Sequence, residues 1–468
     1  MKPMQRRTFV KAMALAGGAA AVHPAFGSTL GGLDGGTGAS RKSRLDASKS
    51  LTLVHSDLHN HSFISGDAEG DPYKALHHLK AAGLDVACMT EHAVSGGYGL
   101  GDHICSKWQD GGCRFITGID DDDWQTMAKI ADEAYEPGKF VSFRGFEYST
   151  PTIGHISVFF GQDFTDPLHE AALVTGSEVA QAYRVFPPLE PISPLFAALP
   201  NTAEIAPFYE WLTNEPGTGL LGGGADAIAS FNHPGYFGNF QNFLYHHKAA
   251  KQIFLIEGFN AITFNGGDSH DATDYFWYGR DSKLPQPFNA CFNAGWKVGF
   301  SGVSDEHSGT YGQTGKGRGG LYVKHLTREG VRRAIMTRRT FGTREPALRI
   351  DATANGVPMG SELAHHSKPL HIKLDIDRGP GWVGKKLHVQ LIGPGKDDPT
   401  LLDVIPIEVP GADKPVIEFT AKPRGSWLFM RICDPKRAND PLGVKPFEDA
   451  TFGGATAYVS PWFFRDGA

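Results

Sequence analysis

The chain has 468 residues, of which 41% are hydrophobic and 21% charged, so it holds enough apolar material for a large core and for two or three domains. Its formal net charge of -6 argues against a protein built to bind nucleic acid. No run of 18 consecutive apolar residues occurs, so we expect no membrane-spanning helix.

The first 27 residues have the order of features of an export signal. Arg6 and Arg7 precede a weakly apolar stretch over residues 12–22, and small residues follow near Gly27. This order is typical of twin-arginine signals. We therefore expect residues 1–27 to be a cleaved signal peptide and residues 28–50 a flexible leader. The protein would then be carried to the periplasm by the twin-arginine export machinery.

The five cysteines are too few and too scattered for a disulfide framework. Cys105 and Cys113 flank a polar loop and could pair in an oxidising compartment, which the sequence leaves open. Cys88 lies in an apolar run and is predicted to be a core residue.

Strand and helix patterns alternate from residue 51 to residue 345. Asp71 and Pro72 are typical of a helix start and Gly83 of its end, and acidic residues begin a second helix over 121–135. Further helices are predicted over 203–212 and 328–338. The predicted strands are 51–57, 84–90, 140–146, 155–160, 227–231, 253–258 and 297–303. This alternation favours an α/β fold with a parallel sheet, which could close into a barrel. Residues 163–224 lack clear periodicity over most of their length and are predicted to be an insertion or lid.

Short strands separated by Pro and Gly replace this alternation after residue 345. The predicted strands are 348–352, 370–376, 387–392, 416–420, 427–432 and 455–459. They predict a C-terminal all-β, sandwich-like domain over residues 346–468.

Histidines and carboxylates lie at the ends of the predicted strands. His59 and His61 share one face of an extended chain and can present two imidazoles to one ion. The other candidates of this kind are Glu91, His92, Glu147, His155, His233, Asp305 and His307. Because the carboxyl ends of parallel strands face the same side, we expect these groups to converge. Such a set suits Zn²⁺, Mn²⁺ or Fe.

The order of these motifs resembles the PHP metallohydrolase superfamily over about residues 51–345. The motifs are His-x-His, an acid-His pair, Gly-x-Glu, Gly-His, His-Pro and Asp-x-His. Residues 137–140, 145–147, 326–329 and 338–341 look more closely like the exported branch that includes the carbaryl hydrolase-like (CehA/McbA) proteins.

The resemblance implies a distorted (βα)7 barrel that binds two or three divalent metal ions. It assigns one ion to His59, His61, Glu147 and Asp305, a second to Glu147, His155 and His233, and a third to Asp67, His92 and His307. It places Asp57 and Glu91 behind these ligands, where they would orient the histidines.

These ions point to a metal-dependent hydrolase that attacks a small-molecule ester with metal-activated hydroxide. Asp305 or His307 would assist proton transfer. The wider superfamily favours a phosphoester and the closer branch a carboxylic or carbamate ester. The alternative is a non-catalytic exported module that binds metal and engages a partner.

Two groups of residues near these motifs have two readings each. Phe240 and Phe243, with other aromatic residues after His233, could line an apolar substrate pocket or pack in the core. Arg144 and Arg280 could contact an anionic substrate or be surface charges.

Overall fold

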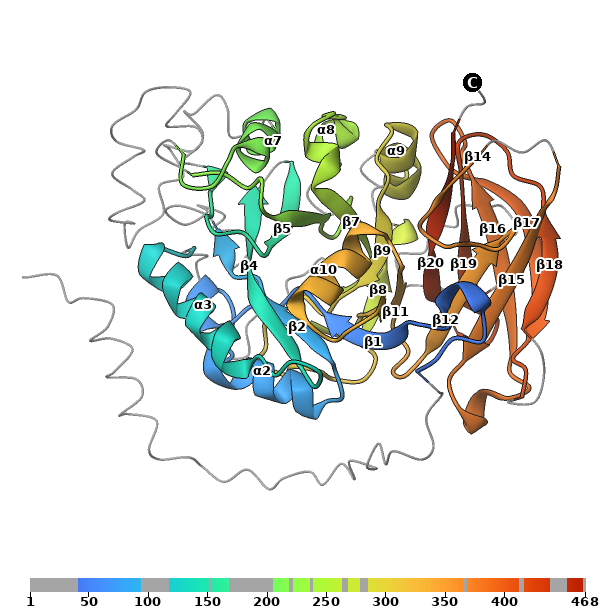
Figure 1. Cartoon of the computed structure of the whole chain (residues 1–468), viewed down its shortest axis with the longest axis horizontal. Helices are drawn as coiled ribbons and strands as arrows, with labels where there is room; N and C mark the ends of the chain where they lie inside the picture. Colours follow the sequence, from blue (N-terminus) through green and yellow to red (C-terminus); the bar gives the residue numbers. More distant parts are fainter. Residues whose placement is uncertain are drawn as a thin grey trace, which may run out of the picture. The chain divides into compact units, whose positions relative to one another are not determined.

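A computed structural model describes residues 41–93, 118–150, 153–167, 205–218, 222–235, 239–262, 268–277, 285–364, 368–411, 416–437 and 453–465. They belong to one compact unit, Ala39–Ala468. The structure is mixed α/β and rich in strands (Figure 1). Among the helices within these ranges, none has both the length and the apolar character that crossing a bilayer requires.

The α-helices are α2 (Pro72–Ala81), α3 (Asp121–Ala134), α7 (Ala206–Thr213), α8 (Phe240–Phe243), α9 (Pro287–Asn293) and α10 (Arg328–Met336). The strands up to residue 343 are β1 (Thr52–Asp57), β2 (Val86–Met89), β3 (His92–Ala93), β4 (Val141–Thr150), β5 (Gly154–Phe159), β6 (Ile228–Phe231), β7 (Ile253–Ile262), β8 (Asp268–Asp274), β9 (Gly299–Gly302), β10 (Arg318–Val323) and β11 (Thr340–Thr343). The later strands are β12 (Arg349–Ala354), β13 (Val357–Pro358), β14 (Glu362–Ala364), β15 (Leu370–Asp377), β16 (Lys386–Gly393), β17 (Thr400–Glu408), β18 (Ile417–Ala421), β19 (Trp427–Asp434) and β20 (Gly454–Arg465).

Local sequence explains where the helices begin. The Asp71 side chain accepts a hydrogen bond from the Tyr73 N–H, and Asp120 and Asp123 form a capping box at the start of α3. The predicted helices over 72–83, 121–135 and 328–338 are confirmed to within two residues at each end. Of the predicted insertion, the structure describes α7 and short flanking segments, and α7 buries Phe208 and Trp211 in the core.

One large mixed sheet contains strands from both halves of the chain, in the order β17-β16-β19-β20-β11-β10-β1-β2-β4-β5-β6-β7-β8. The pairs β1–β2, β2–β4, β6–β7 and β7–β9 are parallel. β5 runs antiparallel to both β4 and β6, so the expectation of a parallel sheet is wrong there. The physical reason is the connection from Thr150 to Gly154, which is far too short for a parallel crossover.

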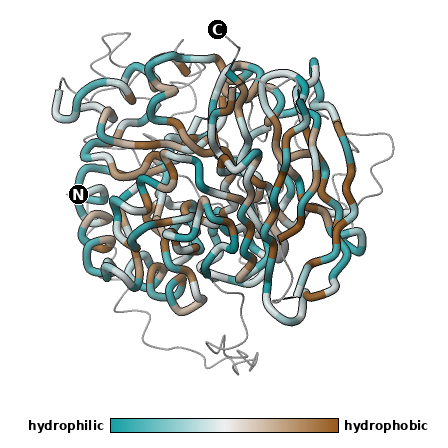
Figure 2. The backbone as a smooth tube through the Cα atoms, turned by 45° about the vertical axis from the view of Figure 1, so that its right-hand side comes forward, coloured by the Kyte–Doolittle hydropathy of each residue, from teal (hydrophilic) through white to brown (hydrophobic). Residues whose placement is uncertain are grey.

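The C-terminal strands form two sheets that share an apolar core. β12, β13, β15 and β18 make a four-stranded sheet, whereas β16, β17, β19 and β20 continue the large sheet through β11 (Figure 1). Leu374 and Ile376 of the smaller sheet pack in one cluster with Leu391 and Ile432 of the larger one. Hydrophobic segments run along these strands (Figure 2). The described residues after β11 contain strands and no α-helix, as the sequence predicts.

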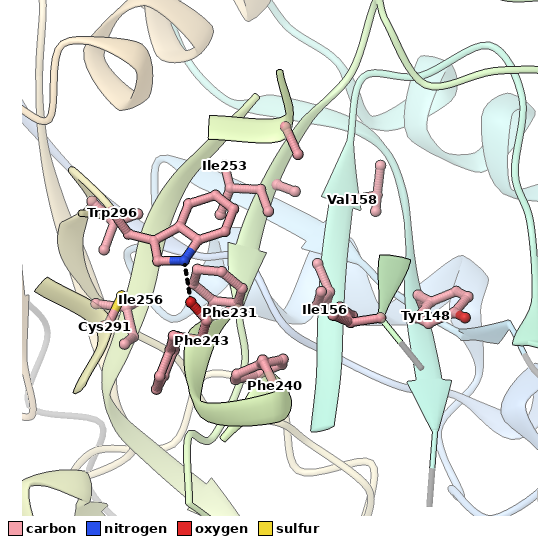
Figure 3. Packing of buried hydrophobic residues seen from close by; sticks show 14 of the residues in the cluster. Tyr148, Ile156, Val158, Phe231, Phe240, Phe243, Ile253, Ile256, Cys291 and Trp296 are labelled. Atoms are coloured by element: carbon pink, nitrogen blue, oxygen red, sulfur yellow. Dashed lines mark hydrogen bonds between the residues drawn. The ribbon is translucent and has the colours of Figure 1, made fainter. Parts of the chain in front are cut away.

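Aromatic residues that follow His233 pack in the core. Phe240 and Phe243 are fully buried, and the Trp296 indole N–H donates a 2.9 Å hydrogen bond to the Phe243 carbonyl (Figure 3). Phe231 lies among them. For these residues packing in the core is therefore the correct interpretation. Residues 236–238 lie outside the described residues, as do Cys105 and Cys113.

A buried ion pair connects β8 to the C-terminal strands. Arg431 of β19 donates a 2.5 Å hydrogen bond to Asp274, which also accepts one from the Tyr458 hydroxyl of β20. The side chains of Arg431 and Asp274 are 2% and 1% exposed, so both charges are buried. Each charge therefore depends on the other for compensation.

Removal of the cation should destabilise the fold. We expect Arg431→Met to lower the free energy of unfolding by about 3–5 kcal/mol, because Asp274 would keep a buried charge without its partner. Denaturant titration measures this change. The double variant Arg431→Met/Asp274→Asn should recover part of the loss. An unchanged unfolding midpoint in the single variant would contradict a stabilising ion pair.

Candidate metal centre

All nine residues that the sequence assigns to metal ions lie in one buried cluster. The most exposed of them, His307, has 7% of its surface accessible. The cluster consists of His59, His61, Asp67, His92, Glu147, His155, His233, Asp305 and His307.

Strand ends supply most of these side chains. His59 and His61 follow β1, His233 follows β6, and Asp305 follows β9. The antiparallel direction of β5 matters for His155, because it places the start of that strand beside the end of β4. A parallel β5 would have carried His155 to the opposite edge of the sheet.

The first assigned group has the spacing that one ion requires. The Nε2 atoms of His59 and His61 are 3.0 Å apart, and Asp305 Oδ1 lies 3.2 and 3.1 Å from them. Glu147 Oε1 lies 3.1 Å from His59 Nε2. An ion about 2.1 Å from each ligand would separate neighbouring ligands by about 3.0–3.4 Å. Asp305 Oδ1 is buried and has no hydrogen-bond partner among the described residues, so the donor set fits a cation.

The other two groups adjoin the first. Glu147 Oε1 also lies 3.2 Å from His155 Nδ1 and 3.3 Å from His233 Nε2, so one carboxylate contacts both the first and the second group. Asp67 Oδ2 lies 3.3 Å from His92 Nε2 and 3.6 Å from the His307 imidazole.

The side chains between these groups do not belong to one group alone. His92 Nδ1 lies 2.8 Å from Glu147 Oε2, and the ligand atoms of His61, His92 and His307 lie within 4.8 Å of one another. The three assigned groups therefore form one continuous cluster, and the distances do not divide its side chains among separate ions.

Oxygen acceptors orient two of the imidazoles, those of His61 and His307. Ser65 donates a hydrogen bond to Glu91 (2.6 Å), so its oxygen accepts the Nδ1–H of His61 at 3.0 Å. The Asp305 carbonyl accepts the Nδ1–H of His307 at 2.9 Å. Both histidines thus keep the Nε2 lone pair directed at the cluster, as metal binding requires.

The two predicted orienting carboxylates act differently. Glu91 reaches His61 through Ser65. Asp57 accepts hydrogen bonds from the backbone N–H of His59 and from the N–H and hydroxyl of Ser304. Asp57 therefore holds the backbone that follows β1 and β9, through hydrogen bonds from backbone N–H groups and a hydroxyl.

Three polar residues of the centre escaped the sequence analysis. Glu257 of β7 accepts the His59 Nδ1–H at 2.8 Å. Asn232 donates to Glu147 Oε1 at 2.7 Å, and Asn260 donates to Asp305 Oδ2 at 3.0 Å. The sequence did contain a signal for Glu257. An acidic residue inside an otherwise apolar strand is costly to bury unless it has a partner, so its presence there predicts a polar contact.

The carboxylates and imidazoles shift one another's pKa values. Burial would raise the pKa of Glu147, but His155, His59 and His92 keep it well below its usual value. Burial likewise opposes a charged His92, yet Asp67 and Glu147 raise its pKa to about 10. For His61, burial and the neighbouring His92 and His307 lower the pKa to about 3. The cluster thus combines ionised carboxylates and a neutral His61, which are the forms that bind metal, with a protonated His92, which would have to lose a proton to bind a metal ion.

The contacts of Arg144 are with residues outside this cluster. Its guanidinium stacks on Trp124, 3.9 Å from the ring centroid, and donates hydrogen bonds to the carbonyls of Gly161 and Gln162. These contacts favour a structural role over contact with an anionic substrate. Arg280 lies outside the described residues.

Comparison with known proteins gives distant similarities. Residues 102–169 match the model of a family described as a protein of unknown function (DUF3604). The chain is similar to a two-domain protein of Bacteroides vulgatus ATCC 8482, whose crystal structure is described as containing a predicted PHP-like metal-dependent phosphoesterase. The two chains share 15% identity, with a TM-score of 0.36 over 91% of this chain and 100% of the other. No curated protein sequence matches.

Metal binding should stabilise the folded chain. We expect Zn²⁺ or Mn²⁺, added to metal-stripped protein, to raise Tm, because an ion that binds only the folded state adds about 2.7 kcal/mol at a hundredfold excess over Kd. Differential scanning calorimetry measures the rise. It should shrink in His61→Ala and persist in His371→Ala, where the imidazole on β15 is half exposed. An equal rise in both variants would contradict this assignment.

Proposed function

We propose that this chain is a metal-dependent hydrolase of the PHP superfamily, with two or three divalent ions (Zn, Mn or Fe) held by the nine clustered residues. The observation that carries the proposal is the convergence of Nε2 atoms and carboxylate oxygens to 3.0–3.3 Å around Glu147 and Asp305. Buried carboxylates at this density need cations to compensate them.

Bound divalent ions would activate a water molecule for attack and polarise the scissile bond of the substrate. The chain supplies the arrangement. Glu257 and Ser65 keep His59 and His61 in the tautomer that directs Nε2 at the centre. Asp305 or His307 is the proposed proton carrier, because both are titratable groups of the cluster and lie side by side, with His307 Nδ1 3.6 Å from Asp305 Oδ1.

The proposed substrate is a small-molecule ester, either a phosphoester or a carboxylic or carbamate ester. The finer proposal, membership of the carbaryl hydrolase-like branch, is supported by the motifs at residues 137–140, 145–147, 326–329 and 338–341. Export through the twin-arginine pathway to the periplasm is supported by the pattern around Arg6 and Arg7.

We propose further that the strands from β1 to β10 form a distorted barrel, followed by a β-sandwich-like domain from residue 346. Close packing of β9 against β10 supports closure, since a Cβ at Gly302 would lie 2.5 Å from the Arg318 carbonyl oxygen. Residues 163–224 would then be an insertion between β5 and β6.

Loss of a central ligand should remove hydrolysis. Loss of a group that only orients a ligand typically costs 10–100-fold, so we expect His59→Ala and Glu147→Ala to lower kcat/KM by more than about a hundredfold. A panel of phosphate monoesters, phosphodiesters and aryl carbamates, assayed with metal-loaded protein, measures the effect. Circular dichroism should show that both variants remain folded.

The matched control is Glu418→Ala, which removes an exposed carboxylate on β18 and should leave turnover unchanged. Full activity in His59→Ala or Glu147→Ala would contradict the proposal. Tight metal binding without turnover on any substrate of the panel would favour the alternative, a non-catalytic metal-binding module.

A further inference from the structure

Strand β7 lies between the two strands that lead into the metal centre. It pairs in parallel with β6, which ends two residues before His233, and with β9, which ends three residues before Asp305. A side chain near the carboxyl end of β7 can therefore reach ligands that arrive from both neighbours.

An irregularity in β7 places the side chains of Glu257 and Asn260 on the same face, toward the metal centre. In a regular strand, residues three positions apart point to opposite faces. The pairing of β7 with β9 shifts register between Glu257 and Phe259, which is the mark of a β-bulge. As a result, Asn260 lies on the same side as Glu257 and donates a 3.0 Å hydrogen bond to its Oε2 atom.

This pair contacts three ligands from three different elements. Glu257 Oε1 accepts the Nδ1–H of His59 at 2.8 Å, and Oε2 accepts the backbone N–H of His233 at 2.6 Å. Asn260 donates to Asp305 Oδ2 at 3.0 Å. One short segment of β7 thus has contacts with groups that follow β1, β6 and β9.

Two of these ligands have strained backbones. His233 has a φ of 21° and Asp305 a φ of 50°, in a region that residues other than glycine rarely adopt. Such conformations cost about 1–3 kcal/mol each and persist only where neighbouring contacts enforce them. The bond from the His233 N–H to Glu257 is a contact of this kind.

Glu257 also lacks an ordinary structural partner. It is 1% exposed, and within the described part of the chain neither a lysine nor an arginine forms an ion pair with it. A carboxylate kept only for stability would be expected to have such a partner. Its contacts are instead His59, His233 and Asn260.

We infer that Glu257 is a positioning residue of the metal centre, which fixes the tautomer of His59 and the backbone of His233, and that Asn260 extends this function to Asp305. The inference rests on the proposed metal-dependent function. Glu257 contacts no substrate in this scheme and acts through the ligands that it orients.

The test is Glu257→Gln, which keeps the shape of the side chain. The amide has one acceptor oxygen and one NH₂ group, so it can accept from His59 or from His233, but not from both. We expect the affinity for Zn²⁺, measured by competition with a chelator, to fall by about 10–100-fold. In histidine-selective ¹⁵N spectra of the zinc-loaded protein, the Nδ1–H signal of His59, identified by its loss in His59→Ala, should shift or disappear.

A matched control separates positioning from stability. Asp351→Asn changes another buried carboxylate, on β12, which accepts hydrogen bonds from the Ser43 hydroxyl and the Ala352 N–H. It should lower Tm and leave zinc affinity unchanged. Asn260→Ser serves as a second variant if Glu257→Gln does not fold, and should weaken zinc binding through Asp305.

The outcomes distinguish the two proposals. If wild-type protein binds Zn²⁺ tightly and both variants bind it with the same affinity and the same His59 signal, the positioning inference is overturned and the proposed function stands. If wild-type protein binds no Zn²⁺, Mn²⁺ or Fe²⁺, both are overturned.

Discussion

The compensation of buried negative charge is the constraint on which this structure depends. Glu147 and Asp305 lie at the bottom of a cluster of imidazoles, with at most 1% of either carboxylate residue exposed. Glu147 alone lies within hydrogen-bond or ion-pair distance of His59, His92, His155 and His233. Such a set is stable only if protons or cations balance it, and protons on the imidazoles occupy the lone pairs that metal ions would use. The buried carboxylates are therefore compensated in the folded chain either by protonated imidazoles or by bound metal ions.

The sheet delivers these residues because its strands do not all run the same way. Parallel strands bring His61 and His233 to one edge, whereas the β4–β5 hairpin returns the chain so that His155 begins a strand where Glu147 lies near the end of another. β7 then adds Glu257 and Asn260 through a local change of register. The antiparallel direction of β5 and the bulge in β7 thus allow side chains from many segments to meet at one edge of the sheet.

The nine clustered residues followed from histidines and carboxylates at predicted strand ends together with the resemblance to the PHP superfamily. Sequence patterns were sufficient for α2, α3 and α10 and for the strands β12, β15, β16, β18, β19 and β20, because capping residues and alternation are local signals. They failed where the determining physics is not local. β10 begins with Arg318-Gly319-Gly320 and β17 contains Pro406. Glycine and proline disfavour strands, so the local sequence predicts neither element, and each forms because of the strands it pairs with. The direction of β5 follows from the length of a turn, and Glu257 gains its meaning only from His59, which is 198 residues away in the chain.

The pairing of β11 with β20 has a practical consequence for any study of residues 51–345, which contain the clustered histidines and carboxylates, as a separate polypeptide. A polypeptide cut after residue 345 would lose β20, the strand that pairs with the edge of β11. It would also lose the aromatic ring of Tyr458, which packs against Phe259 and Phe300, so these two side chains would become exposed. An open, apolar sheet margin of this kind invites self-association. Shortened versions should therefore precipitate or form aggregates even though all nine clustered residues are retained.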